Sequence, residues 1–270
     1  MRARRGVYSL HSTRARVLCV AALCGAGLLL AACMRAAALE PAGFSAAQRG
    51  LVPGPGASEP YVVALDAGHG GFDTGANALV QELGVCEQTV DVLYALLEAD
   101  PNYTPLRTRP NGEDRSIKER AQAADDGGAQ LLLSIHANSD ESTHQSHGFE
   151  CFPTPPGRRH SEEAMRFALC IAQRMGQAGH RLRGGNGVRF AYYSGKHKQI
   201  VDSTEDRPRT QKSFGIVERP DCPAVLAEQC FLTNYSDVEQ WTGEAGCARA
   251  ARVYYDAICA YFGTQPLESA

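Results

Sequence analysis

Two histidines follow apolar segments of the chain that have the character of buried strands. His69 follows the run 61–66, and His136 follows the run 129–135. Apolar runs of this length, bounded by turn residues, are typical of interior strands of an α/β sheet. Functional groups of such sheets lie just past the carboxyl ends of the strands. The two imidazoles are therefore expected at one edge of the sheet, where they suit a shared metal ion.

A carboxylate, that of Glu228, lies inside a third apolar run, 223–232. Burying an unpaired carboxylate is costly, so Glu228 is expected to have a partner, a bound metal or an altered pKa. The alternative is a structural glutamate that bonds backbone amides or an arginine, because such networks also hold buried acids.

Glu87 is the remaining candidate ligand. Apolar residues from Val90 to Leu97 follow a helical stripe, and Glu87 lies three residues before Val90, on the same inward face of the first turn. An acid in this position binds a cation or stabilises the helix dipole, and the second role is the commoner one. Glu82 is a rival, but the pattern places it before the helix, in a loop.

Two imidazoles, one carboxylate ligand and a further carboxylate are typical of a catalytic zinc site with an open position for water. Zinc lowers the pKa of such a water to about 7, and the second carboxylate can carry a proton from it to a leaving amine. The candidate ligands are scattered along the chain rather than packed in a short H-E-x-x-H signature, so their spacing alone does not establish the site.

Four segments resemble the signature blocks of one enzyme family. In chain order they are V-A-L-D-A-G-H-G-G, C-E-Q-T-V-D, S-I-H-A-N and P-A-V-L-A-E-Q-C-F-L-T-N. They resemble the zinc-dependent N-acetylmuramoyl-L-alanine amidases of the type-3 family. The segments 107–109 and 116–120 fall where that family has its T-R and L-x-x-R motifs. The resemblance covers residues 59–263 and departs from the family pattern at Thr74, where proline is usual, and at Cys230, where glycine is usual.

The resemblance implies a role for each candidate residue. His69, Glu87 and His136 would bind zinc, and Glu228 would be the catalytic glutamate. The implied reaction is hydrolysis of the amide between the lactyl group of N-acetylmuramic acid and L-alanine in peptidoglycan. Two alternatives stay open: a related zinc peptidase or aminoacylase, and a lipid-anchored peptidoglycan-binding protein without turnover.

The N-terminal segment has the composition of a secretion signal. Five arginines and no acidic residue precede Cys33, and an apolar stretch fills 17–32. Leu30-Ala31-Ala32-Cys33 resembles a bacterial lipobox, so residues 1–32 are predicted to be removed and Cys33 to be acylated, which gives an exported, periplasmic protein anchored to the membrane. Conventional cleavage near 36–38 and an uncleaved anchor are the alternatives.

Composition also indicates where the domains begin and end and which class of partner is unfavoured. Residues 33–58, rich in Ala, Gly and Pro, predict a flexible tether, and 59–265 predict one catalytic domain, expected to be a monomer. Removal of the five arginines shifts the formal net charge from −3 to −8, which argues against a nucleic-acid partner. Seven cysteines lie beyond Cys33, so at least one stays unpaired within the chain if disulfides form.

The catalytic segment alternates strand and helix patterns, which predicts an α/β fold. Besides the runs already described, strands are expected near 103–107, 148–152, 214–218 and 224–229, and helices are expected to begin near 87, 116 and 161 and to close the chain. The family resemblance implies a twisted mixed sheet of about six strands with helices on both faces. The polar stretch 183–212 is predicted to be a long loop that borders the substrate groove. In this prediction Tyr192 and Tyr193 stack on sugars, and Arg189 or Lys196 contacts peptide carboxylates. A solvated surface loop is the alternative.

Overall fold

The structure is a computed structural model, and it describes residues 59–268. Strands and helices alternate along this part of the chain. In chain order the elements are β1 (Tyr61–Ala67), α2 (Glu82–Glu98), β2 (Tyr103–Arg107), α3 (Ile117–Asp126), β3 (Leu131–Asn138), β4 (Glu150–Pro153), α4 (Ser161–Gln177), β5 (Arg189–Ser194), β6 (His197–Asp202), α5 (Gly215–Glu218), β7 (Ala224–Phe231), α6 (Tyr235–Trp241) and α7 (Gly243–Phe262).

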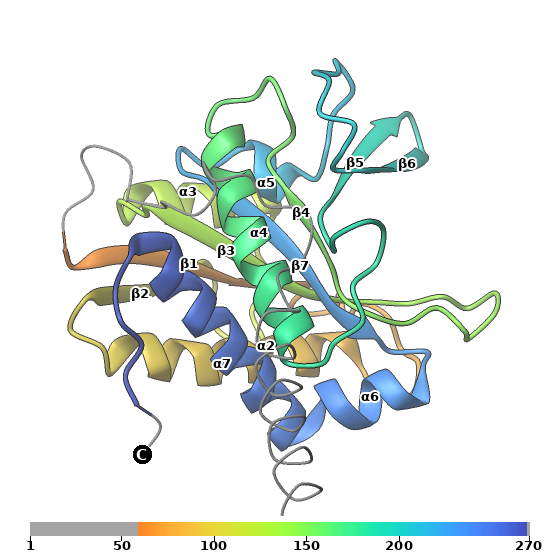
Figure 1. The fold of residues 1–270 in the computed structure, drawn as a ribbon, viewed down its shortest axis with the longest axis horizontal. Helices are drawn as coiled ribbons and strands as arrows, with labels where there is room; N and C mark the ends of the chain where they lie inside the picture. Colours follow the sequence, from red (N-terminus) through yellow and green to blue (C-terminus); the bar gives the residue numbers. More distant parts are fainter. Residues whose placement is uncertain (1–58, 269–270) are drawn as a thin grey trace, which may run out of the picture. The chain divides into compact units, whose positions relative to one another are not determined.

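Five strands form one sheet in the order β2-β1-β3-β7-β4. The first four strands run parallel, and β4 pairs antiparallel with β7 at the edge. Strands β5 and β6 form a separate antiparallel pair, which lies above the end of the sheet in Figure 1. The predicted α/β fold with a mixed sheet is confirmed, with five strands in that sheet where about six were expected.

Helices cover both faces of the sheet, as predicted (Figure 1). Side chains alternate across a strand, so neighbouring residues of one strand enter different cores. Leu65 and Leu133 pack beneath α2, α4 and α7, whereas Ala64 and Leu132 pack against α3 and α5. Strands β1, β3 and β7 are buried along nearly their whole length, which explains why their sequences are almost continuously apolar.

Two predicted segments take another form. Residues 214–218 are not a strand: Gly215–Glu218 is the short helix α5, because β4 already occupies the edge beside β7 and Ile216 and Val217 instead pack against a face of the sheet. The stretch 183–212 is not one long loop, because it contains the β5–β6 hairpin. A two-residue turn closes this hairpin, with Gly195 at a φ of 61°.

The predictions for residues 1–32, for the tether 33–58 and for Cys33 lie outside the described residues. Within residues 59–268, no helix is long and apolar enough to cross a membrane. The seven cysteines of this range are all buried and unpaired, which is consistent with small hydrophobic side chains in the core.

Candidate active site

The two predicted histidines come from neighbouring parallel strands. Strands β1 and β3 pair through Ala67 and Ile135, so the residues that follow emerge at the same edge of the sheet. His136 belongs to β3, whereas His69 lies two residues past β1, with its backbone in the left-handed region at a φ of 62°. The centroids of the two imidazole rings are 4.9 Å apart.

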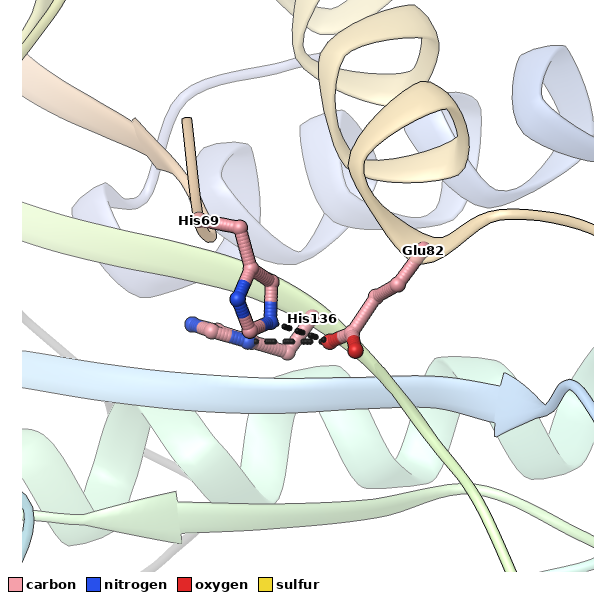
Figure 2. A group of neighbouring side chains, drawn as sticks. All are labelled: His69, Glu82 and His136. Carbon is pink, nitrogen blue, oxygen red and sulfur yellow. Dashed lines mark hydrogen bonds and ion pairs between the residues drawn. The ribbon is translucent and has the colours of Figure 1, made fainter. Parts of the chain in front are cut away.

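The carboxylate that lies against both imidazoles is that of Glu82, the first residue of α2 (Figure 2). Its Oε1 is 3.0 Å from His69 Nε2 and 3.1 Å from His136 Nδ1. Backbone amides orient it, since Ala76 N donates to Oε2 and Ala137 N donates to Oε1. Burial alone would raise the pKa of the Glu82 carboxyl, but its hydrogen bonds and the imidazole charges outweigh burial and hold the pKa below its usual range.

We call His69, Glu82 and His136 the His–Glu–His cluster. Each residue offers one ligand atom, and these atoms all lie within 4.8 Å of one another. Two imidazole nitrogens and one carboxylate oxygen form a donor set typical of catalytic zinc, which keeps a further position for water. The residues present therefore fit a divalent metal of this kind.

Glu87, the third ligand predicted from the sequence, does not belong to the cluster. Its Oε1 accepts hydrogen bonds from Arg109 Nη1 at 2.6 Å and from the amide of Gly112 at 2.7 Å. The physical reason is the start of the helix: α2 begins at Glu82, so Glu82 occupies the first turn at the sheet edge, and Glu87 lies more than one turn further along. Glu82 replaces Glu87 as the candidate ligand.

Two glycines leave the space that the cluster fills. A Cβ on Gly68 would lie 2.4 Å from Cε1 of His136, and a Cβ on Gly75 would lie 2.6 Å from both Glu82 Oε2 and His69 Cδ2. Contacts this short do not occur between real side chains, so a larger residue at either position would displace a ligand.

Asp73 orients the imidazole of His69 from the side opposite Glu82. Its Oδ2 is 2.9 Å from His69 Nδ1, and its Oδ1 accepts the amide of Gly75 at 3.0 Å. A carboxylate on one ring nitrogen fixes the tautomer, which leaves Nε2 free to face a metal. Burial lowers the pKa of His69, but Glu82 and Asp73 outweigh burial and raise it to about 9.

Glu228 lies beside the cluster on β7. It pairs in parallel register with His136 of β3, so both side chains leave the same face of the sheet. Its Oε2 is buried and has no hydrogen-bond partner among the described residues. Burial raises the pKa of Glu228 to about 7; His136 opposes this rise and Glu82 reinforces it. A carboxyl group with a pKa near neutrality can both accept and release a proton.

A cavity of about 550 Å³ lies over these side chains. Its wall includes the whole His–Glu–His cluster together with Glu228. The start of α3 and the segment around α5 form other parts of the wall, with Ser116, Ile117, Phe214 and Ile216. The cluster and Glu228 thus face the same cavity, which also has apolar surface that a substrate can contact.

The stretch 183–212 contributes less to the cavity than predicted. Tyr192 is buried in a small separate core. Arg189 Nη1 lies 2.6 Å from Oε2 of the buried Glu150. Neither side chain is therefore free to contact a substrate. Tyr193 does not line the cavity either, but its ring packs against Phe214 of the cavity wall at a centroid distance of 5.7 Å.

The position of Glu82 had a signal in the sequence that the prediction missed. The buried stripe of α2 extends back from Leu93 through Val90 and Cys86 to Leu83, at helical spacing. Followed backwards, this stripe starts the helix before Leu83 and places Glu82 in its first turn. Gly84 within the first turn, and the absence of a side-chain cap at Gln81, obscure this start.

Sequence comparisons connect the chain with known proteins. A model of the N-acetylmuramoyl-L-alanine amidase family matches residues 63–260. The probable N-acetylmuramoyl-L-alanine amidase AmiB of Haemophilus influenzae is 28% identical over 230 residues, which cover 75% of this chain and 52% of that protein. The Bacillus subtilis protein YqiI is 29% identical over 248 residues, which cover 89% and 95% of the two chains. The chain thus spans about half the length of AmiB and nearly all of YqiI.

The fold is shared with solved amidase structures. The catalytic domain of CwlV, an N-acetylmuramoyl-L-alanine amidase from Bacillus (Paenibacillus) polymyxa var. colistinus, superposes with a TM-score of 0.61 at 24% identity. The superposition covers 76% of this chain and 99% of that domain. The family predicted from the four sequence blocks is confirmed by the match over 63–260. This chain belongs to the type-3 N-acetylmuramoyl-L-alanine amidase family and is an amidase.

Proposed function

We propose that this amidase is a zinc-dependent peptidoglycan hydrolase that cleaves the amide between N-acetylmuramic acid and L-alanine. The observation that carries the proposal is the meeting of the His–Glu–His cluster and the unpartnered carboxylate of Glu228 in one cavity. A structural glutamate would have found hydrogen-bond partners, because an unpaired buried polar group is costly.

In this proposal His69, Glu82 and His136 hold the metal. When bound, zinc supplies Lewis acidity toward the scissile carbonyl and lowers the pKa of a water ligand. Asp73 keeps the His69 imidazole in the tautomer that presents Nε2 to the metal. The short backbone contacts of Glu82 keep its carboxylate between the two imidazoles.

Glu228 is the proton carrier of the proposed reaction. It accepts a proton from the attacking water and delivers it to the alanine nitrogen, which leaves as an amine and would otherwise be a poor leaving group. The pKa of about 7 that burial gives Glu228 in the metal-free protein suits both steps at neutral pH. Its place beside His136 in the strand register supports this assignment.

Digestion of purified peptidoglycan, followed by mass spectrometry, tests the reaction. The proposal expects free stem peptides that begin with L-alanine, together with glycan strands stripped of peptide. Shortened stem peptides on an otherwise intact glycan would instead identify a zinc peptidase. A zinc-loaded protein that binds peptidoglycan and releases nothing would favour a binding protein without turnover.

Substitution of Glu228 separates the two parts of the site. Glu228→Gln should lower kcat by about 10²–10⁴-fold, because general acid–base catalysis is lost. The same variant should keep its zinc, because Glu228 is not one of the three proposed ligands. Unchanged turnover in a folded Glu228→Gln protein would contradict the proton-carrier role.

The proposal extends to the place of action. An arginine-rich, acid-free start followed by an apolar stretch and Leu30-Ala31-Ala32-Cys33 supports export and acylation at Cys33, with residues 33–58 as the tether. Metabolic labelling with a fatty acid in a bacterial host, compared between the wild type and Cys33→Ser, tests the anchor. Label in the wild type alone is expected, and no label in either protein would contradict acylation.

A further inference from the structure

Two arginines hold the backbone of the loop that carries His69. Arg109 donates from Nε to the carbonyl of Ala67 at 3.1 Å and from Nη2 to the carbonyl of Gly68 at 2.9 Å. Arg120 donates from Nη1 to the carbonyl of Ala67 at 2.7 Å and from Nη2 to the carbonyl of His69. Three successive carbonyl groups are thus bound by two guanidinium groups from different parts of the chain.

These carbonyls lie where β1 leaves the sheet. The chain then turns through His69 at a φ of 62° and Gly70 at a φ of 136°. A residue other than glycine in the left-handed region costs about 1–3 kcal/mol and persists only where its surroundings enforce it. A buried carbonyl also needs a hydrogen-bond partner. The arginines meet both needs, because they satisfy the carbonyls and fix the turn.

The arginines are themselves firmly placed. Arg109 is 2% exposed and Arg120 is 6% exposed. Arg109 Nη1 lies 2.6 Å from Glu87 Oε1, and Arg120 Nη1 lies 3.3 Å from Asp66 Oδ1. A buried cation is stable only when it is paired and hydrogen-bonded, and both guanidinium groups satisfy that condition here. Glu87, unsuited by position to ligate the metal, therefore has a defined role as the counter-charge of Arg109.

We propose that Arg109 and Arg120 are positioning residues that set His69 in its ligand orientation through the backbone, with Glu87 acting in the same unit. The inference rests on the proposed role of His69 as a metal ligand. The hydrogen bonds of both arginines end on backbone carbonyls, Glu87 and Asp66, and none ends on a ligand atom of the cluster.

The planar fork of arginine is needed for this role. A guanidinium group presents five N–H donors in a fixed plane, which lets one side chain bond two adjacent carbonyls. A lysine ammonium keeps the charge but not this geometry. Arg109→Lys and Arg120→Lys should therefore leave the loop less well placed and weaken zinc binding by about 10–100-fold, the usual effect of losing a group that orients a ligand.

The test measures zinc affinity by competition with a chromogenic chelator for the wild type and both lysine variants. Arg107→Lys is the matched control, because Arg107 pairs with Asp91 at 2.8 Å and makes no hydrogen bond to the His69 loop. Weaker binding by the two variants, normal binding by the control, and recovery of kcat at saturating zinc are expected. Recovery of kcat separates a loss of ligand placement from general damage to the active site.

Each result has a distinct meaning. Folded lysine variants that bind zinc as tightly as the wild type would overturn the inference and leave the proposed function standing. A wild type that binds no zinc would overturn the proposed function itself. If the lysine variants fail to fold, Glu87→Gln decides the matter, because it removes only the counter-charge of Arg109: weaker zinc affinity supports the inference, and unchanged affinity contradicts it.

Discussion

At the scale of single residues, two glycines are as important to the His–Glu–His cluster as the three side chains that form it. Gly68 lies against the imidazole of His136, and Gly75 lies against both Glu82 and His69. The three side chains of the His–Glu–His cluster can approach one another because these two positions carry no Cβ. The close approach of the three cluster side chains thus depends on Gly68 and Gly75, which carry no functional group.

Gly68→Ala should lower zinc affinity, because its new Cβ would fall 2.4 Å from the His136 ring and push that imidazole out of the cluster. Titration with zinc against a competing chelator measures the effect. Gly84→Ala is the control: nothing lies within 4 Å of its Cβ position, and alanine there should stabilise α2 by about 0.5–1 kcal/mol while zinc affinity stays the same. Equal zinc affinity in the wild type and Gly68→Ala would contradict this account of the close approach.

The sequence was sufficient to single out His69, His136 and Glu228, because each follows or interrupts an apolar strand pattern. It was insufficient for the carboxylate between the imidazoles. Glu82 and Glu87 both precede an apolar stripe, and the choice between them depends on where the helix begins. The buried stripe back to Leu83 points to the correct start, but Gly84 and the missing side-chain cap obscure it. The hydrogen bond from the amide of Ala137 to Glu82, which brings this carboxylate to β3, is a contact across the fold that no local pattern contains.

At the scale of elements, the start of α3 combines a local motif with a role in the site. Ser116 accepts a hydrogen bond from the amide of Glu119, and the Glu119 carboxylate accepts one from the amide of Ser116. This capping box starts the helix near 116, where the sequence predicted it. The first turn of this helix leads to Arg120, one of the two arginines that hold the His69 loop.

Ser116→Ala should destabilise the protein by about 1 kcal/mol, because the amides of the first helical turn lose their side-chain acceptor. Urea unfolding of the metal-free protein measures the change in the free energy of unfolding. Glu119→Ala removes the other half of the capping box and should also lower the free energy of unfolding. An unaltered unfolding midpoint in Ser116→Ala would show that the cap does not stabilise α3.

A second element-scale prediction concerns His180, which joins the end of α4 to β7 and α6. Its ring stacks on Trp241 at a centroid distance of 4.2 Å, and its Nε2 donates to the carbonyl of Gln229. Burial lowers the pKa of His180, and the nearby His147 lowers it further. The hydrogen bond to Gln229 and the charge of Asp237 raise the pKa but do not outweigh burial. The folded protein thus holds His180 neutral at pH values where the unfolded chain protonates it.

The sign of the pH effect follows from this difference. The unfolded chain binds more protons at His180 just below the unperturbed pKa of 6.5, so the contribution of His180 to the free energy of unfolding should fall as pH decreases through that value. His69 and Glu228, whose pKa values are raised in the folded protein, contribute with the opposite sign, so the effect of His180 is the difference between the wild type and a variant that lacks it. Urea unfolding at about pH 8 and about pH 5.5 measures this slope. His180→Phe keeps the stacking ring but cannot titrate, so on going from about pH 8 to about pH 5.5 the wild type should lose more stability, or gain less, than His180→Phe. Identical slopes in the two proteins would rule out His180 as a source of the pH dependence.

Strand and helix patterns predicted most elements because local periodicity and burial agree in them. They failed at 214–218, where a short apolar segment packs on the sheet face as α5 without joining the sheet. They also failed at the β5–β6 hairpin, whose exposed, charged second strand lacks an apolar pattern. In both places the form of the segment depends on which neighbours are already paired, and a local pattern does not contain that information.

At the scale of the whole molecule, the parallel order β1-β3-β7 explains how residues from position 69 to position 228 meet. Parallel strands run toward the same edge, so His69 just past β1, His136 in β3 and Glu228 in β7 reach one cavity, to which α2 adds Glu82. Three of the family blocks recognised in the sequence lie on these strands and the turns that follow them, which is why the fold was predictable from them. The remaining block, 86–91, lies within α2 and begins after Glu82, so it did not identify the carboxylate that joins the cluster.

Zinc bound to this cluster should also stabilise the whole domain. A ligand that binds only the folded state adds about 2.7 kcal/mol at a free concentration one hundred times its Kd. Thermal unfolding with and without zinc should therefore show a higher Tm for the loaded wild type, and a chelator should reverse the gain.

The most direct test of the account is the zinc content of the wild type, Glu82→Gln and Glu87→Gln, measured by plasma mass spectrometry after dialysis against the same excess of zinc. The account predicts one zinc per chain in the wild type and in Glu87→Gln, because the excess of zinc fills even a site of reduced affinity, and a folded but nearly empty Glu82→Gln protein. A wild type without zinc, or a Glu82→Gln protein that keeps it while Glu87→Gln loses it, would contradict the His69–Glu82–His136 site.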